Sequence, residues 1–291
     1  MLSNPNVKVN LGLNVLRKRE DGFHDLCTLF VPYLGISDRL EIITGDEWSQ
    51  ISAQLFAKYG ADRSELSANL VQGMSEDGKL MITIARKEGV DWDPLKDLTA
   101  KAYFLLSEDF DLPPVKIFLE KNSPVGAGLG GGSSDAAFAL KMMNEMFSLK
   151  LSDEELVSYA ARLGSDCAFF IYNRPMLGEG RGEILTDFPL PELLSQDSRY
   201  ELQVVVPEGV SVSTADAYRG IVPSVPENDL RTILSRPIYE WKELLANDFE
   251  KTVFQKYPEL SKIKDSLYDS GAVYASMSGS GSALFAIYHK N

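Results

Sequence analysis

The chain has 291 residues, of which 44% are apolar, 24% charged and 10% aromatic. This length suits about two globular domains, and the composition excludes a collagen, a coiled coil and a disordered tail protein. Against 42 Asp and Glu residues stand 29 Lys and Arg residues, which gives a net charge of −13. A field of that sign repels phosphate backbones and anionic lipid surfaces, so we expect neither nucleic acid nor a membrane as a partner.

The two cysteines, Cys27 and Cys167, are too few for a disulfide framework, and neither lies in a zinc-binding pattern. We interpret them as reduced core thiols and predict no dedicated metal site. The first residues lack the unbroken apolar core of a signal peptide, because Lys8, Asn10 and Asn14 interrupt it. The expected location is the cytoplasm.

The N-terminal part of the chain is rich in strand patterns. The run VKVNLGLNV alternates from Val7, with Lys8 and Asn10 on the polar side, which predicts a half-buried strand. Two more strands are expected in CTLFVPYL and DRLEIIT, with a break at residues 35–38. Residues 46–95 are irregular, with a helix-like stretch WSQISAQLFAKYG and a strand candidate KLMITIARK.

Helix and strand patterns alternate in the middle of the chain. DLTAKAYFLLSEDF has helical spacing, and PPVKIFLEK alternates as a strand that ends near Lys121. A glycine-rich loop then runs into an apolar helix that reaches Phe147. Ser152 and Glu155 form a capping box that opens a further helix, which Gly164 ends.

A second unit is expected to begin with the strand YELQVVVP, after the glycine-rich turn GEGRGEIL. Its further elements are helices near residues 214–219, 238–245 and 260–270 and strands near residues 272–277 and 283–288. We predict an α+β protein of two domains, residues 1–196 and 197–291.

The stretch GAGLGGGSSDAA places glycines and two serines directly before a helix. Backbone N–H groups can approach a phosphate there, and the helix N-terminus adds partial positive charge. Gly126, Gly128 and Gly131 also fit the GxGxxG pattern of a dinucleotide-binding turn, but the strand that such a unit needs next is missing. No Lys stands between the last glycine of the loop and Ser133, so the Walker A pattern is absent. The buried helix that follows directly disfavours a flexible linker.

The stretch PVGAGLGGGSSDAA resembles the phosphate-binding motif of the GHMP kinases, the superfamily of galactokinase, homoserine kinase and mevalonate kinase. VKVNLGL with DGFHDLCTLF, LGSDCAFFI, and NDFEKTVFQKYPEL with MSGSGSALFA resemble one family within it, the 4-diphosphocytidyl-2-C-methyl-D-erythritol kinases. The matches occur in family order along nearly the whole chain. The resemblance implies Mg²⁺- and ATP-dependent phosphorylation of the 2-hydroxyl of 4-diphosphocytidyl-2-C-methyl-D-erythritol, in the non-mevalonate isoprenoid route.

The resemblance also implies that the glycine loop holds the ATP phosphates, with Ser133 or Ser134 near Mg²⁺ or a phosphate oxygen. Both serines suit helix capping as well, and the two roles are compatible. Lys121 aligns with a family residue near the adenine; a solvated lysine at a strand end is the competing interpretation. The residues expected at the nucleotide are Lys121, Pro124, Val125, Gly126, Ala127, Gly128, Leu129, Gly130, Gly131, Gly132, Ser133 and Ser134.

For catalysis, the resemblance assigns Asp166 as the base that accepts the proton of the substrate hydroxyl. Lys8 aligns with the family lysine that pairs with this carboxylate and favours the developing alkoxide. Without the resemblance, Lys8 would be interpreted as a surface lysine on a strand and Asp166 as a turn residue.

The expected small-molecule substrate is assigned four contacts by the resemblance. Asn10 would meet the methylerythritol portion, His24 would bind the cytosine edge, and Phe23 and Tyr218 would stack on the base. Three departures from the family pattern concern the nucleotide and base sites: Phe23 in place of Tyr, Asp97 in place of Asn, and NVK in place of PAK.

The implied fold places the active site in the cleft between the two domains, closed by a small-residue loop at Gly279 and Gly281. We expect a monomer or a weak homodimer. The alternatives are a GHMP kinase that acts on mevalonate or homoserine, an NAD-binding oxidoreductase, and a nucleotide sensor without activity. His24 with two aromatic residues favours cytosine over a small acid, and a sensor needs neither Lys8 nor Asp166.

Overall fold

The computed structural model describes residues 1–45, 47–60 and 68–290. It divides the chain into two compact units, each assembled from separate stretches of sequence. Unit 1 contains Met1–Val7, Ile36–Ser123 and Gly131–Tyr172, and unit 2 contains Lys8–Gly35, Pro124–Gly130 and Asn173–Asn291. The domain boundary after residue 196 stays a prediction. Within the described residues, no helix has the length and apolar character to cross a bilayer.

Unit 1 is built on a five-stranded sheet of order β1-β4-β7-β6-β5. β6 and β7 run parallel, and the other neighbours pair antiparallel. The strands expected in DRLEIIT, KLMITIARK and PPVKIFLEK are confirmed as β4, β6 and β7, the three central strands. The bounds are β1 (Leu2–Ser3), β4 (Arg39–Thr44), β5 (Leu70–Met74), β6 (Leu80–Arg86) and β7 (Val115–Lys121).

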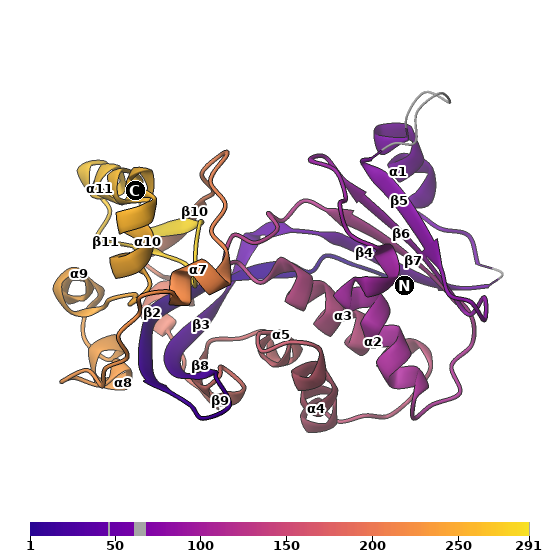
Figure 1. The fold of residues 1–291 in the computed structure, drawn as a ribbon, viewed down its shortest axis with the longest axis horizontal. Helices are drawn as coiled ribbons and strands as arrows, with labels where there is room; N and C mark the ends of the chain where they lie inside the picture. Colours follow the sequence, from indigo (N-terminus) through magenta and orange to yellow (C-terminus); the bar gives the residue numbers. More distant parts are fainter. Residues whose placement is uncertain (46, 61–67, 291) are drawn as a thin grey trace. The chain divides into compact units, whose positions relative to one another are not determined.

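Helices cover both faces of this sheet (Figure 1). α2 and α3 lie against one face with α4 and α5 beyond them, and α1 lies on the other, where Leu55 and Tyr59 pack with Phe118. The predicted capping box of Ser152 and Glu155 opens α4. The bounds are α1 (Ser52–Tyr59), the 3₁₀ turn η1 (Pro94–Lys96), α2 (Leu98–Ser107), α3 (Gly131–Met146), α4 (Asp153–Leu163) and α5 (Cys167–Tyr172).

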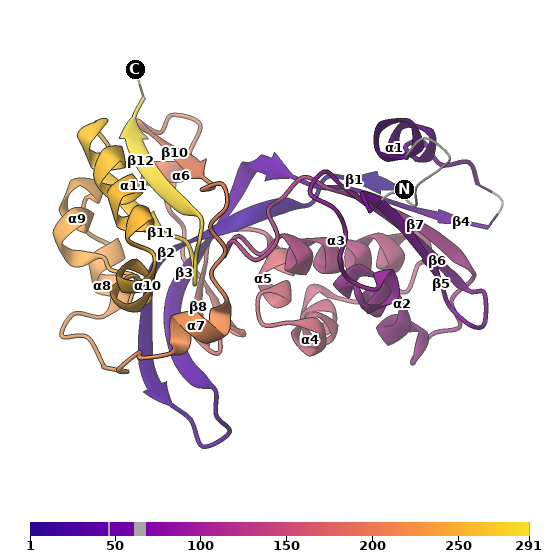
Figure 2. The same cartoon turned by 45° about the horizontal axis from the view of Figure 1, so that its top comes forward.

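Unit 2 contains two sheets, of order β2-β3-β8-β9 and β10-β12-β11. α11 packs along the second sheet, as Figure 2 shows, and α10 packs on α11. The strands are β2 (Asn6–Lys18), β3 (His24–Ser37), β8 (Met176–Gly180), β9 (Ile184–Asp187), β10 (Tyr200–Val205), β11 (Tyr274–Met277) and β12 (Leu284–His289). The helices are α6 (Pro191–Leu194), α7 (Thr214–Tyr218), α8 (Leu230–Leu234), η2 (Ile238–Glu240), α9 (Trp241–Leu244), α10 (Glu250–Lys256) and α11 (Pro258–Asp269).

The burial of β2 departs from its prediction. Residues 6–13 are buried without alternation, so the expectation of a half-buried strand is wrong. In unit 2 the polar side of the strand is covered: the Lys8 N–H donates to the Leu129 carbonyl at 2.9 Å, and the Asn10 N–H donates to Ser278 Oγ at 3.3 Å. The polar residues of β2 therefore bind other segments of the chain rather than water.

Both cysteines are free thiols, as predicted, but only Cys167 is buried; Cys27 is half-buried. Burial raises the pKa of Cys167 to about 12 and that of Cys27 to about 11. Neither thiol is therefore ionised at neutral pH.

Candidate active site

Within unit 2, the glycine loop has a backbone that only glycine adopts readily. Gly126, Gly128 and Gly130 have φ angles of +71°, +77° and +73°, so positive values alternate along the loop. A Cβ atom added to Gly128 would lie 2.1 Å from the Ser278 carbonyl oxygen. All three positions therefore favour glycine for their conformation, and Gly128 also requires it for close packing.

Hydrogen bonds from the protein hold the carbonyl groups of this loop. Lys8 Nζ and Ser278 Oγ donate to the Gly128 carbonyl at 2.8 Å and 3.1 Å, and the Ala283 N–H donates to the Ala127 carbonyl at 3.1 Å. The small-residue loop at residues 278–283 thus lies against the glycine loop. The structure brings together these two glycine-rich segments, which the sequence only suggested were related.

Lys8 and Asn10 lie side by side, as their shared strand face predicted. Lys8 is 3% exposed, and its Nζ donates to Asn10 Oδ1 at 2.6 Å. Asn10 Nδ2 donates to Thr28 Oγ1 at 3.0 Å, and Thr28 in turn donates to the Gly12 carbonyl at 2.6 Å. The competing interpretation of Lys8 as a surface lysine is wrong, and Thr28 is a supporting residue that the sequence did not single out.

Within unit 1, the first turn of α3 lies beside the turn that carries Asp166. Gly164 and Cys167 flank this turn, and a Cβ atom on Gly164 would lie 3.8 Å from Ser133 Oγ. Asp166 is half-buried, whereas Ser134 is fully buried. Among the described residues, Ser134 Oγ has no hydrogen-bond partner. Asp166 and Lys8 belong to different units, so their pairing stays a prediction.

Lys121 lies in a buried ionic cluster, which we name the Lys121 cluster, with Asp38 and Asp135. Its Nζ donates to Asp38 Oδ2 at 2.5 Å and to Asp135 Oδ2, and its side chain is only 3% exposed. The interpretation of Lys121 as a solvated lysine is therefore wrong. Its contact with adenine stays a prediction, and neither aspartate was recognised in the sequence.

Burial and charge act in opposition in the Lys121 cluster. Burial favours the neutral amine of Lys121, but the two carboxylates outweigh it and raise its pKa. Burial opposes ionisation of Asp38, yet the charge of Lys121 and hydrogen bonds from Lys121 and Ser123 hold the pKa of Asp38 below its ordinary value. For Asp135 the effect of burial exceeds that of the Lys121 charge, and the pKa of Asp135 is raised well above the ordinary value.

Two of the three residues expected at the cytosine lie together in unit 2. The rings of His24 and Tyr218 stack with centroids 4.7 Å apart and an interplanar angle of 24°. Tyr218 also packs edge-on against Phe249, with centroids 4.8 Å apart. Phe23 is 54% exposed, and the Arg181 guanidinium lies over its ring, 5.0 Å from the centroid. Burial, with the charge of Lys18, lowers the pKa of His24.

Known proteins are similar to this chain over nearly its whole length. The model of the GHMP kinases N terminal domain matches residues 97–174, and that of the GHMP kinases C terminal region matches residues 230–291. A 4-diphosphocytidyl-2-C-methyl-D-erythritol kinase from Bacteroides fragilis is 44% identical over 99% of this chain and 92% of its own length. One from Nitratidesulfovibrio vulgaris is 32% identical over 97% of this chain and 88% of its own length.

Solved structures of similar fold agree with these sequence relatives. A crystal structure of 4-(cytidine 5'-diphospho)-2C-methyl-D-erythritol kinase has a TM-score of 0.71 at 30% identity, covering 98% of this chain and 89% of the other. Mevalonate kinase from Methanococcus jannaschii has a TM-score of 0.60 at 13% identity, covering 100% and 90% of the two chains, which shows a shared fold alone.

The matched domain models and the mixed α+β fold define the chain as a GHMP kinase, a class of enzymes that use ATP. The whole-length identity narrows this class further. The chain belongs to the family of 4-diphosphocytidyl-2-C-methyl-D-erythritol kinases. The NAD-binding oxidoreductase considered from the GxGxxG spacing is therefore wrong.

Proposed function

We propose that the chain transfers the γ-phosphoryl group of ATP to the 2-hydroxyl of 4-diphosphocytidyl-2-C-methyl-D-erythritol, a step of the non-mevalonate isoprenoid route. The observation that carries this proposal is the 44% identity to a kinase of that name over 99% of the chain. The local geometry of the glycine loop, of Lys8 and of the His24–Tyr218 pair supports it.

The glycine loop is proposed to bind the ATP phosphates. Positive φ angles that alternate along a loop, as at Gly126, Gly128 and Gly130, can turn successive N–H groups toward one side, where they surround an anion. The N-terminus of α3 adds partial positive charge. Mg²⁺ prefers hard oxygen ligands and keeps several waters, so Ser133 Oγ and phosphate oxygens suit it. When bound, Mg²⁺ neutralises phosphate charge.

Asp166 and Lys8 are proposed to carry the chemistry. The Asp166 carboxylate accepts the proton of the 2-hydroxyl as the hydroxyl oxygen attacks the γ-phosphorus; the bond from that phosphorus to the bridging oxygen breaks, and ADP leaves. The Lys8 ammonium favours the anionic oxygen. Because Lys8 also donates to the Gly128 carbonyl, a movement of the phosphate loop would shift the Lys8 ammonium relative to the attacking oxygen.

The acceptor is proposed to bind by its base and by its polyol. A lowered pKa keeps His24 neutral at pH 7, so the ring can both donate and accept hydrogen bonds at the cytosine edge. Tyr218, held edge-on by Phe249, and the exposed Phe23 offer stacking faces. Asn10, beside Lys8, is proposed to meet the methylerythritol portion.

We also propose three further properties of the protein. They are a cytoplasmic location, an active site in a cleft between the domains, and a monomer or a weak homodimer. Light scattering of the purified protein over a range of concentrations tests the last of these.

The direct test measures ADP release with Mg-ATP and one of three acceptors: 4-diphosphocytidyl-2-C-methyl-D-erythritol, mevalonate or homoserine. Release with the cytidylyl acceptor alone is expected. Asp166→Asn should lower turnover by about 100-fold or more, because a general base is lost. Asp153→Asn, at an exposed carboxylate of α4, is the matched control and should retain parental turnover. Release with mevalonate or homoserine instead, or an active Asp166→Asn variant, would overturn the proposal.

A further inference from the structure

The two ends of the glycine loop meet inside unit 1. The chain enters the loop after Ser123 and leaves it at Gly131. A Cβ atom on Gly131 would lie 2.2 Å from Ser123 Oγ and 3.5 Å from Lys121 Nζ. Gly131 thus allows the first turn of α3 to sit directly on Ser123 and on the Lys121 cluster.

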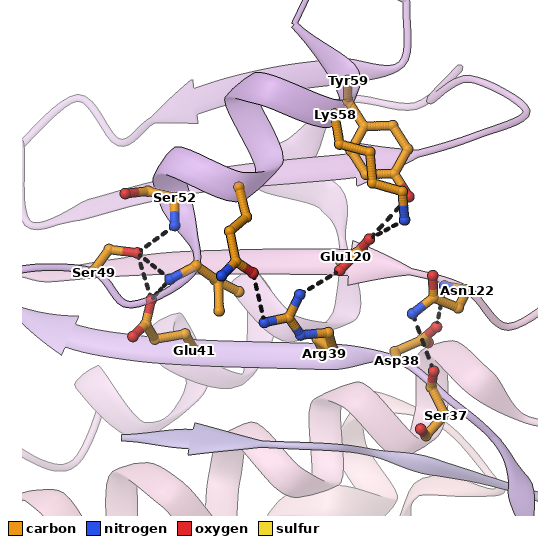
Figure 3. Close-up of polar contacts among 12 residues, drawn as sticks. Ser37, Asp38, Arg39, Glu41, Ser49, Ser52, Lys58, Tyr59, Glu120 and Asn122 are labelled. Carbon is orange, nitrogen blue, oxygen red and sulfur yellow. Dashed lines mark hydrogen bonds and ion pairs between the residues drawn. The ribbon is translucent and has the colours of Figure 1, made fainter.

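One carboxylate holds the entrance to the loop. Asp38 Oδ1 accepts hydrogen bonds from the Asn122 and Ser123 N–H groups, both at 2.6 Å, and Oδ2 accepts from Ser123 Oγ at 2.7 Å. Asp38 is 1% exposed and precedes β4, whereas Ser123 follows β7. Figure 3 shows the Asp38 side chain reaching Asn122 at the end of that strand.

The same carboxylate reaches the exit of the loop through Lys121. Lys121 Nζ binds Asp38 and, on α3, Asp135. Asp135 is 1% exposed, and its second oxygen has no hydrogen-bond partner among the described residues. Burying these charges is costly, and replacing such a cluster by well-packed apolar residues is often neutral or stabilising. The arrangement therefore calls for a role in geometry rather than in stability alone.

We propose that Asp38 is a positioning residue for the nucleotide, which acts through Ser123 and Lys121 to hold the two ends of the phosphate-binding loop at a fixed separation. The inference rests on the proposed function, because it takes the ATP phosphates as the ligand of the loop. Asp38 itself need not touch the nucleotide.

Glu120 provides a matched control. It is the neighbour of Lys121 on β7, so its side chain leaves the opposite face of the sheet. It is 3% exposed and binds Arg39 at 3.1 Å, Lys58 at 2.7 Å and Tyr59 at 3.0 Å (Figure 3). Removing its charge breaks an ionic cluster around a buried carboxylate, whose partners Lys58 and Arg39 are partly exposed and which contacts α1.

The experiment measures the Kd of Mg-ATP by calorimetry for the parent, Asp38→Asn, Ser123→Ala and Glu120→Gln, beside the thermal unfolding midpoint of each. Asp38→Asn should weaken ATP binding by about 10-fold or more and Ser123→Ala by about 3-fold. Glu120→Gln should bind ATP within about 2-fold of the parent although its unfolding midpoint falls. In turnover, Asp38→Asn should raise KM for ATP with kcat at saturating ATP within about 3-fold.

Parental ATP affinity in folded Asp38→Asn would overturn the inference, as would equal weakening in Glu120→Gln, which would show a general loss of stability. If Asp38→Asn does not fold, unchanged affinity in Ser123→Ala overturns it instead. Because Kd is measured without an acceptor, a parent protein that binds ATP but does not phosphorylate the cytidylyl acceptor contradicts the proposed function and not this inference.

Discussion

At the scale of single residues, Asp135 shows how a buried charge couples stability to pH. Burial raises its pKa well above the ordinary carboxyl value, although the charge of Lys121 opposes the shift. The folded chain therefore keeps a proton that the unfolded chain releases above about pH 4. It follows that the contribution of Asp135 to stability is present below that pH and is lost as pH rises.

We accordingly expect Asp135→Asn to be more stable than the parent by about 1 kcal/mol at pH 7.5, because an amide does not ionise and can still accept from Lys121. The difference should shrink toward pH 4. Urea unfolding of both proteins across this range measures it, and a difference that stays constant with pH would contradict the assignment.

Glu120→Gln should change the stability in the opposite direction when urea unfolding is measured over the same pH range. Burial works against ionisation of Glu120, but hydrogen bonds and charge from Lys58, Tyr59 and Arg39 hold its pKa below the ordinary value. Its contribution is present above about pH 4.3 and is lost as pH falls. The variant should be less stable than the parent at pH 7.5, and the deficit should shrink on acidification.

Gly128 and Gly132 separate the glycines that the fold requires from those it tolerates. Gly128→Ala should destabilise the chain by about 1–3 kcal/mol, because φ is +77° and the new Cβ would lie 2.1 Å from the Ser278 carbonyl oxygen. Gly132 lies in α3, and a Cβ atom added there would meet no atom within 4 Å, so Gly132→Ala should leave stability unchanged or slightly raised. Thermal unfolding distinguishes them; equal losses in both would refute this explanation.

At the scale of elements, the sequence predicted whether a segment is a helix or a strand better than it predicted how deeply that segment is buried. Alternation located β7, the strand candidate KLMITIARK became β6, and Ser152 with Glu155 located the start of α4, because these signals are local. The sequence of β2 does alternate, but the inference that its polar side is exposed was wrong, because another segment covers that side. α10 was missed because, of its residues, only Val253 is buried, so its helical pattern is weak.

α1 is an element held by two buried glutamates, and this gives a prediction of its own. Glu41 accepts from Ser49 Oγ at 2.5 Å, just before the helix (Figure 3). It also accepts from the Gln50 N–H at 2.8 Å. Glu41→Gln should leave part of this set unpaired and cost about 1–3 kcal/mol. In hydrogen exchange, protection should fall in α1 and stay parental in α4.

The matched variant for this test is Ser152→Ala, which removes an exposed cap at α4. It should cost about 1 kcal/mol and lower protection in the first turn of α4 while leaving α1 unchanged. Protection lost evenly over unit 1 in Glu41→Gln would show that Glu41 stabilises the whole sheet rather than one helix.

At the scale of the whole molecule, pairs far apart in sequence explain what sequence reasoning could not reach. Asp38 and Lys121 are separated by 83 positions, and Lys8 and Gly128 by 120. Nothing in a single sequence indicates that such residues meet, because each residue type is ordinary in its local pattern. The family resemblance identified the motifs, but only the fold shows that Lys8 supports the glycine loop.

The net charge of −13 leads to a prediction about ionic strength. ATP and the cytidylyl acceptor are both anions, so the overall field opposes their approach, whereas the positive charge of Lys8 and of the α3 N-terminus, where we propose that ligands bind, acts only at short range. Between about 10 mM and 100 mM salt the Debye length falls from about 30 Å to about 10 Å, which screens the distant repulsion more than contacts within the protein. We therefore expect kcat/KM for ATP to rise by about 2-fold over this range. An uncharged sugar at equal osmolality should have no such effect, and a fall with salt would mean that exposed cations dominate the approach of the nucleotide.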